Sequence, residues 1–189
     1  MMGSLYVVFS DLDDNQLLTP QPDRISGLRF STAVDAGYKD CSFRYACDLV
    51  EAFVFYLSRL NYRVQVYEGD TVVWEGRLSG AEIIMGGVNI TARGYHRAAY
   101  DKPYSGSFVA GEHANTIITT VLTASCPDLT AGIIGDPGVV IANIAYGDNQ
   151  YPGDIFTKLA EAGSATALWH WHVWAGKTLD FSAKNTTVN

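Results

Sequence analysis

Apolar and polar residues alternate most regularly between residues 61 and 80, where the pattern predicts a β-hairpin. Val64 and Val66 alternate with polar neighbours, as in a strand that buries one face. Glu68-Gly69-Asp70 is typical of a turn, and the apolar run Val72-Val73-Trp74 predicts the returning strand.

Similar short segments on either side of this hairpin predict further strands. Polar or glycine-containing turns such as Asp35-Ala36-Gly37 and Gly86-Gly87 separate them. We expect these strands at residues 5–9, 25–34, 39–47, 82–85 and 88–95. About seven closely spaced strands favour a β-barrel or a β-sandwich that covers residues 1–105.

The third of these strands has one apolar face. Cys41, Phe43 and Tyr45 share that face, which predicts that it is buried. Core positions follow from the alternation, and turn positions follow from the glycines that interrupt it. The residues that we assign to the core and turns of this domain are Phe43, Val66, Gly69, Trp74 and Gly76.

Residues 48–60 carry apolar side chains at a spacing that suits a helix, although their aromatic content also suits a strand. We interpret the segment as a short helix, because Asp48 can cap its first turn. Helical spacing places these apolar residues on its inner side: Leu49, Phe53, Tyr56, Leu57 and Leu60.

A helical pattern begins again after about residue 106. From Ala114 onward, apolar residues recur at i, i+3, i+4, i+7 and i+8, which predicts an amphipathic helix over residues 112–125. Pro127 follows and prevents its continuation.

The end of the chain predicts one more helix and one more hairpin. The helix covers residues 154–162, with Asp154 as its N-cap and Gly163 as its C-terminal stop. Residues 168–173 and 177–182 predict the two strands of the hairpin. The fold class expected is therefore mainly β with some α, a β-barrel or sandwich followed by a small α+β domain at residues 106–189.

Charge and cysteine content narrow the classes of function. The 189 residues carry a net charge of −7 with dispersed basic residues, which argues against a nucleic-acid-binding surface. We find no apolar run long enough to span a membrane. Cys41 and Cys47 on one strand would lie roughly 20 Å apart, too far to form a disulfide. We expect all three cysteines to be reduced thiols.

Two histidines in residues 169–174 raise the hypothesis of a metal site. His170 and His172 share one face of the expected strand, and histidines at this spacing can bind zinc. A complete site needs further ligands, and the remaining histidines are His96 and His113. We therefore expect no metal and no cofactor.

The tryptophans of the same strand suggest an alternative function. Trp169 and Trp171 are most simply core residues on the face opposite the histidines. Together with Trp174 they could instead stack on sugar rings, which is the alternative hypothesis of a carbohydrate-binding β-module.

Enzymatic chemistry has little support in the sequence. Asp11, Asp13, Asp14 and Asn15 lack the spacing of a calcium-binding EF-hand, so we interpret them as a solvated turn. A third hypothesis is a hydrolase that uses a pair of carboxylates, a chemistry that has no short sequence motif. Its candidates also have simpler roles at the surface or at helix ends: Glu51, Glu75, Glu82 and Asp154. We expect no catalytic residue and no enzymatic activity.

In order and spacing, several segments together resemble the baseplate hub and tail-tip proteins of bacteriophages. This group includes the late control protein D family. The likeness spans nearly the whole chain and is carried by Cys-Ser-Phe-Arg at 41–44, the hairpin at 62–78, Ile-Thr-Ala-Arg-Gly-Tyr at 90–95, the helix start at 112–118, Asp-Ile-Phe-Thr-Lys-Leu-Ala-Glu-Ala-Gly at 154–163 and Gly-Lys-Thr-Leu-Asp-Phe at 176–181.

The resemblance implies a structural role. Hub proteins of this kind use tube-like β-barrel domains to form a ring, typically of three chains, which closes the tail tube and permits DNA passage. The implied partners are further copies of this chain, the tail tube and other tail-tip or baseplate proteins. The implied location is the virion tail, after assembly in the host cytoplasm. Hub proteins are usually longer than 189 residues.

Overall fold

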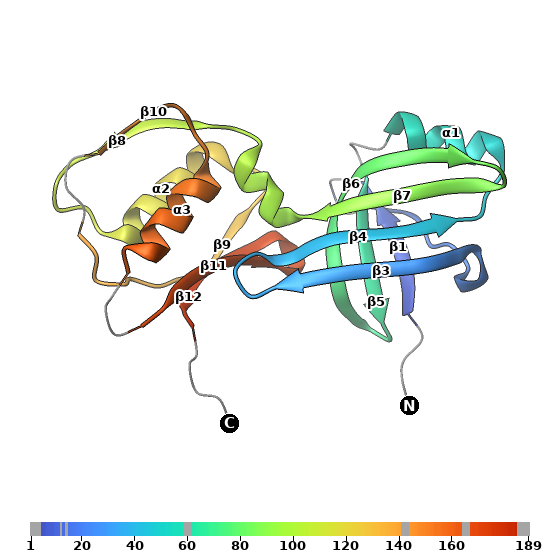
Figure 1. Ribbon diagram of the computed structural model, residues 1–189, viewed down its shortest axis with the longest axis horizontal. Coiled ribbons are helices and arrows are strands. Elements are labelled where there is room, and N and C mark those ends of the chain that lie inside the picture. Colours follow the sequence, from blue (N-terminus) through green and yellow to red (C-terminus); the bar gives the residue numbers. More distant parts are fainter. Residues whose placement is uncertain are drawn as a thin grey trace. The chain divides into compact units, whose positions relative to one another are not determined.

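The computed structural model describes residues 5–11, 13, 15–58, 62–140, 144–163 and 167–184 (Figure 1). The protein is mainly β with some α, as the sequence predicts. Among the described residues, no helix is both long enough and apolar enough to cross a membrane.

The chain forms two compact units. The first contains Met1–Ala33 and Tyr38–Tyr95, and the second contains Val34–Gly37 and His96–Asn189. The division therefore follows Tyr95 rather than the expected position near residue 105. The second unit also takes in a short segment from the first half of the chain.

In the first unit, the described strands form one sheet. Pairing between β1 and β5, β5 and β6, β6 and β7, and β7 and β4 is antiparallel. In order across the sheet, the strands are β2 (Gln16–Leu18), β1 (Leu5–Ser10), β5 (Arg63–Glu68), β6 (Thr71–Ile84), β7 (Gly87–Gly94), β4 (Gly37–Tyr45) and β3 (Ile25–Ala33). A short 3₁₀ turn, η1 (Pro22–Arg24), precedes β3.

The sheet of the first unit curls strongly around its core. β5, β6 and β7 lie between β1 and β4 in the strand order, so a flat sheet would separate β1 from β4 by about 19 Å. Yet the rings of Phe9 on β1 and Phe43 on β4 lie 6.0 Å apart. The sheet is therefore barrel-like, and its concave side buries Phe43, Val66 and Trp74, of which Val66 and Trp74 are fully buried.

The two glycines assigned to turns differ in their positions. Gly69 lies in the β5–β6 turn at φ +58°, a conformation that favours glycine. The assignment of Gly76 to a turn is wrong, because β6 runs through it without a break. Gly76 pairs with Gly94, and a Cβ at Gly76 would lie 2.2 Å from the carbonyl oxygen of Arg93. Its role is to allow β6 and β7 to approach closely.

The helix expected after Asp48 is confirmed as α1 (Leu49–Ser58), which packs against β6 and β7 (Figure 1). The Asp48 carboxylate accepts a hydrogen bond from the backbone N–H of Glu51 at 2.8 Å, which caps the first turn.

The buried face of α1 differs from the expected one. The residues that pack inward are Ala52 and Phe55. Four of the expected inner residues are 44% to 77% exposed, namely Leu49, Phe53, Tyr56 and Leu57, and Leu60 lies outside the described residues. The expectation failed because α1 is apolar on both sides, so periodicity could not identify the side that faces the sheet.

In the second unit, two helices lie between two β-layers (Figure 1). The helices are α2 (Ala114–Ser125) and α3 (Pro152–Glu161). One layer pairs β8 (Tyr104–Phe108) with β10 (Ile144–Gln150). The other contains β11 (Trp169–Trp174), β12 (Thr178–Ala183) and β9 (Thr130–Ile134). Two 3₁₀ segments complete the unit, η3 (Tyr95–Tyr100) at its start and η4 (Ala175–Lys177) between β11 and β12.

The two helices of this unit follow the sequence pattern to different degrees. All the periodic apolar positions of α2 are buried, as the spacing predicts: Ala114, Ile117, Ile118, Val121 and Leu122. The N-cap expected for α3 is wrong, because Tyr151 occupies that position and Pro152 is the first helical residue. Asp154 lies inside the first turn, where the positive end of the helix dipole stabilises its negative charge.

Candidate functional site

The β11–β12 hairpin carries the side chains that the sequence singles out. Trp171 pairs with Phe181 across the hairpin, and His172 pairs with Asp180. Because side chains alternate along a strand, Trp169 and Trp171 lie on one face of β11, and Trp174 lies on the other. Trp174 instead contacts His172, with ring centroids 5.1 Å apart. The three tryptophans therefore do not form the single stacking platform that a glycan site would need.

The indoles of Trp169 and Trp171 are engaged in packing. Trp171 is 5% exposed, and its Nε1–H donates to Thr157 Oγ1 at 3.0 Å. Trp169 stacks on Phe181 with ring centroids 5.4 Å apart. Its indole also lies close to Gly163, where a Cβ would come within 2.7 Å of the ring. These contacts support the simpler interpretation of both tryptophans as packing residues.

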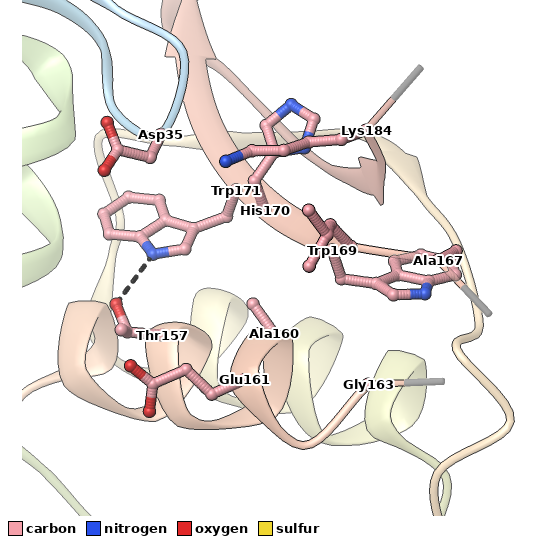
Figure 2. Close-up of a pocket in the computed structure, with 11 residues that line it drawn as sticks. Asp35, Thr157, Ala160, Glu161, Gly163, Ala167, Trp169, His170, Trp171 and Lys184 are labelled. Carbon is pink, nitrogen blue, oxygen red and sulfur yellow. Dashed lines mark hydrogen bonds between the residues drawn. The ribbon is translucent and has the colours of Figure 1, made fainter. Parts of the chain in front are cut away.

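A pocket of about 360 Å³ opens between α3 and β11 (Figure 2). Its wall carries the carboxyl groups of Asp35 and of Glu161 on α3. The imidazole of His170 and the amine of Lys184 also line it. The buried Nδ1 of His170 has no hydrogen-bond partner among the described residues. The described lining of the pocket is therefore polar and of mixed charge.

The paired histidines have low proton affinity. Their rings stack with centroids 5.0 Å apart. Burial lowers the pKa of His170, and the neighbouring His172 lowers it further. Burial also lowers the pKa of His172, while Asp180, with an oxygen 3.5 Å from Nε2, acts in the opposite direction.

The described residues do not supply the further ligands of a metal site. Among them, no group of three or more His, Cys, Asp or Glu side chains could hold a metal ion. His113, a candidate from the sequence, lies 2.9 Å from a carboxylate oxygen of Asp136. His96 lies in the 3₁₀ segment η3.

The first unit contains a buried ion pair that the sequence analysis did not identify. A guanidinium nitrogen of Arg63 lies 2.5 Å from Glu75 Oε2, and both side chains are almost completely buried. Gln65 also donates to Glu75, at 3.3 Å. The hairpin register offered a signal, because Gln65 and Glu75 are cross-strand partners and Arg63 lies two residues before Gln65 on the same face.

The carboxylates proposed for a hydrolase have separate local contacts. Glu75 belongs to the buried ion pair. Glu51 accepts a hydrogen bond from the Tyr45 hydroxyl at 2.6 Å, and Glu82 accepts one from Asn89 at 3.1 Å. Asp154 lies in the first turn of α3, in the other unit.

The other reactive groups also have structural surroundings. The Asp11 carboxylate accepts hydrogen bonds from the backbone N–H groups of Asp13 and Asn15, as in a turn. Asp14 lies outside the described residues. Cys41, Cys47 and Cys126 are free, and burial raises the pKa of Cys41 and Cys126 to about 12, which makes them poor nucleophiles at neutral pH.

Comparison with known proteins gives likeness in fold without likeness in sequence. No family model matches the chain, and no curated protein matches it in sequence. The chain is similar over 95% of its length to the 43 kDa tail protein of prophage MuSo2 from Shewanella oneidensis, with a TM-score of 0.64 and 13% identity. It is similar over 93% of its length to prophage tail protein gp18 from Listeria monocytogenes, with a TM-score of 0.58 and 13% identity.

A third similar structure is the Francisella PdpA–VgrG complex. The likeness covers 100% of this chain at a TM-score of 0.55 and 12% identity. The chain spans 54% of the Shewanella protein, 50% of the Listeria protein and 31% of the matched Francisella chain. Its structural neighbours thus include phage tail proteins, so the likeness in fold agrees with the resemblance seen in the sequence.

Proposed function

We propose that this chain is a structural component of a phage or prophage-like tail tip, where it forms a homo-oligomeric hub between the tail tube and the distal host-binding apparatus. The observation that carries the proposal is the fold likeness, which covers both units of the chain in two tail proteins. The proposal is an analogy of fold, and because one fold can serve several functions, the measurements below decide it.

The surface chemistry is consistent with a conduit for DNA. A net charge of −7 provides no excess of basic groups to bind phosphates, so passing DNA would not be retained. The proposed role is non-enzymatic, and its partners are further copies of the chain, in a ring of three, together with the tail tube and other tail-tip proteins. The proposed location is the virion tail, after assembly in the host cytoplasm.

Two measurements test this function. Light scattering during size exclusion gives the solution mass across a concentration series, and a trimer or hexamer would support a ring. Immunogold electron microscopy of purified particles, with antibodies raised against this chain, gives its position. Gold at the distal end of the tail supports the proposal, and particles without gold overturn it. A tail-tube antibody serves as the positive control for labelling.

A further inference from the structure

The outward side of α1 carries a continuous apolar stripe. Val50, Phe53, Val54 and Leu57 recur at i, i+3, i+4 and i+7, which places them along one side of the helix. Val50 and Leu57 are 75% and 77% exposed, and Phe53 and Val54 are nearly half exposed. We call these four residues the α1 stripe.

The exposed area approaches that of a protein–protein contact. Together with Leu49 and Tyr56 at its margin, the α1 stripe exposes an area on the order of 600 Å². This estimate takes the accessible surface of each fully exposed side chain as roughly 150–200 Å². The largest apolar patch on a typical monomer covers about 300–600 Å². Each partner buries about 800 Å² in an interface of standard size. One such contact would therefore be built largely from this helix.

The stripe is held outward by the packing of the opposite side of α1. The Phe55 ring lies 4.8 Å from that of Phe9 and 5.5 Å from that of Tyr45. Asp48 caps the first turn. Turning the stripe toward the sheet would remove Phe55 from the core, so the exposed side is a fixed surface of the fold.

The stripe is also free of charge. The acidic residue of α1, Glu51, is held by the Tyr45 hydroxyl at 2.6 Å and lies 3.8 Å from Arg24. Two copies of a chain with a net charge of −7 repel each other, so they associate most favourably where their surfaces are uncharged and apolar.

We propose that the α1 stripe is buried against a second copy of this chain and forms the main apolar contact between neighbouring subunits. This inference rests on the proposed function, because a ring of identical chains requires such a surface on every subunit. It goes further by assigning the contact to one helix of the first unit.

The test is a double variant that charges the stripe and preserves the helix. Val50→Glu places a negative charge in the first turn and Leu57→Lys places a positive charge in the last turn, and the helix dipole favours both. Val109→Glu with Ile133→Lys is the matched control, because these residues are 67% and 70% exposed in the second unit and receive the same charges. Far-UV circular dichroism and a thermal melt verify that both variants fold.

We expect the stripe variant to be monomeric at concentrations where the wild type and the control form the same oligomer. The dissociation constant should rise at least about thirtyfold, as expected when apolar residues at the centre of an interface are lost. An oligomer of unchanged mass in the stripe variant overturns the inference and leaves the tail function standing. A wild-type chain that is monomeric throughout also overturns it, while the immunogold result judges the tail function separately.

A photo-crosslinking residue at Phe53 identifies the occupant of the stripe directly. A crosslink to a second copy of the chain supports the proposal. A crosslink only to another tail protein, or only to lipid, assigns the stripe to that partner and overturns the contact between copies.

Discussion

Helices α1 and α2 are of similar length and each buries one side, but their exposed sides differ completely. α2 presents Thr119, Thr120 and Thr123 to solvent, and each hydroxyl donates to the carbonyl of the residue four positions earlier. α1 presents Val50 and Leu57 instead. The surface of α2 suits water, whereas that of α1 suits a protein partner.

The two units also differ in how they bury polar groups. The first unit buries a charged pair, Arg63 with Glu75. The second unit partly buries His170 and His172, whose lowered pKa values keep them neutral near pH 7. A buried charged pair depends on both members, whereas a neutral histidine pair depends on pH.

The buried side of α1 should contribute strongly to the stability of the first unit, even though the opposite side of the helix is exposed. We expect Phe55→Ala to lower the free energy of unfolding of the first unit by about 3–5 kcal/mol, because it leaves a cavity among aromatic rings. Thermal and urea unfolding followed by circular dichroism measures the loss. Thr120→Ala on the outward side of α2 is the control and should change stability by no more than about 0.5 kcal/mol. A loss below about 1 kcal/mol for Phe55→Ala would mean that α1 is only loosely attached.

The ion pair should show strong coupling between its two members. Arg63→Met leaves the Glu75 carboxylate buried without its cation and should cost about 3–5 kcal/mol, with Glu75→Leu similar. The double variant should recover most of this loss, because it leaves no unpaired buried charge. Urea unfolding of the four proteins gives the coupling energy. Losses that simply add in the double variant would contradict a functioning pair.

The smallest expected effect is a pH dependence confined to the second unit. Both histidines have a lower pKa in the folded chain than the ordinary value of about 6.5, so below that pH the unfolded chain binds more protons. Stability should therefore decrease as the pH falls from about 7 through 6.5, until it reaches the folded pKa values.

Melting temperature measured at several pH values tests this effect. Replacing both histidines, as His170→Gln with His172→Gln, should flatten the profile over this range. A profile with the same slope in this variant would assign the pH dependence to other groups. The double variant Arg63→Met with Glu75→Leu should keep the wild-type slope, because it leaves no unpaired buried charge and its pair lies in the other unit.

The comparison between α1 and α2 also shows which parts of the fold could be predicted from the sequence. The buried face of α2 was predicted correctly, because polar threonines separate its apolar positions. The buried face of α1 was not, because apolar residues surround the helix. The N-cap of α3 was misplaced, although Pro152 carried the signal that the helix begins there.

Some strands gave no usable local pattern. β8 has the sequence Tyr-Ser-Gly-Ser-Phe, and four of the five residues of β9 are exposed. β9 pairs in parallel with β12, which lies far along the chain, so its partner could not be inferred from neighbouring residues.

The surroundings of the β11 side chains also depend on contacts with residues distant in the sequence, which the local pattern could not predict. Alternation correctly predicted the shared face of His170 and His172. The sequence could not show that Trp171 would donate to Thr157 on α3 and become buried. The hypothesis of a three-tryptophan glycan platform failed at Trp174. Trp174 lies two residues after His172, so its side chain is on the same face of β11 as the histidines and opposite the other two tryptophans.

The segment Val34–Gly37 has a consequence for how the two units can be exchanged between genes by recombination. It belongs to the second unit, where Gly37 pairs with Val173, yet it is encoded between two stretches that belong to the first. A single genetic exchange at the codons for Tyr95 and His96 would therefore transfer the second unit without one of its pieces. A Cβ at Gly37 would lie 2.1 Å from the Val173 carbonyl oxygen, so the recipient must supply a glycine at this position.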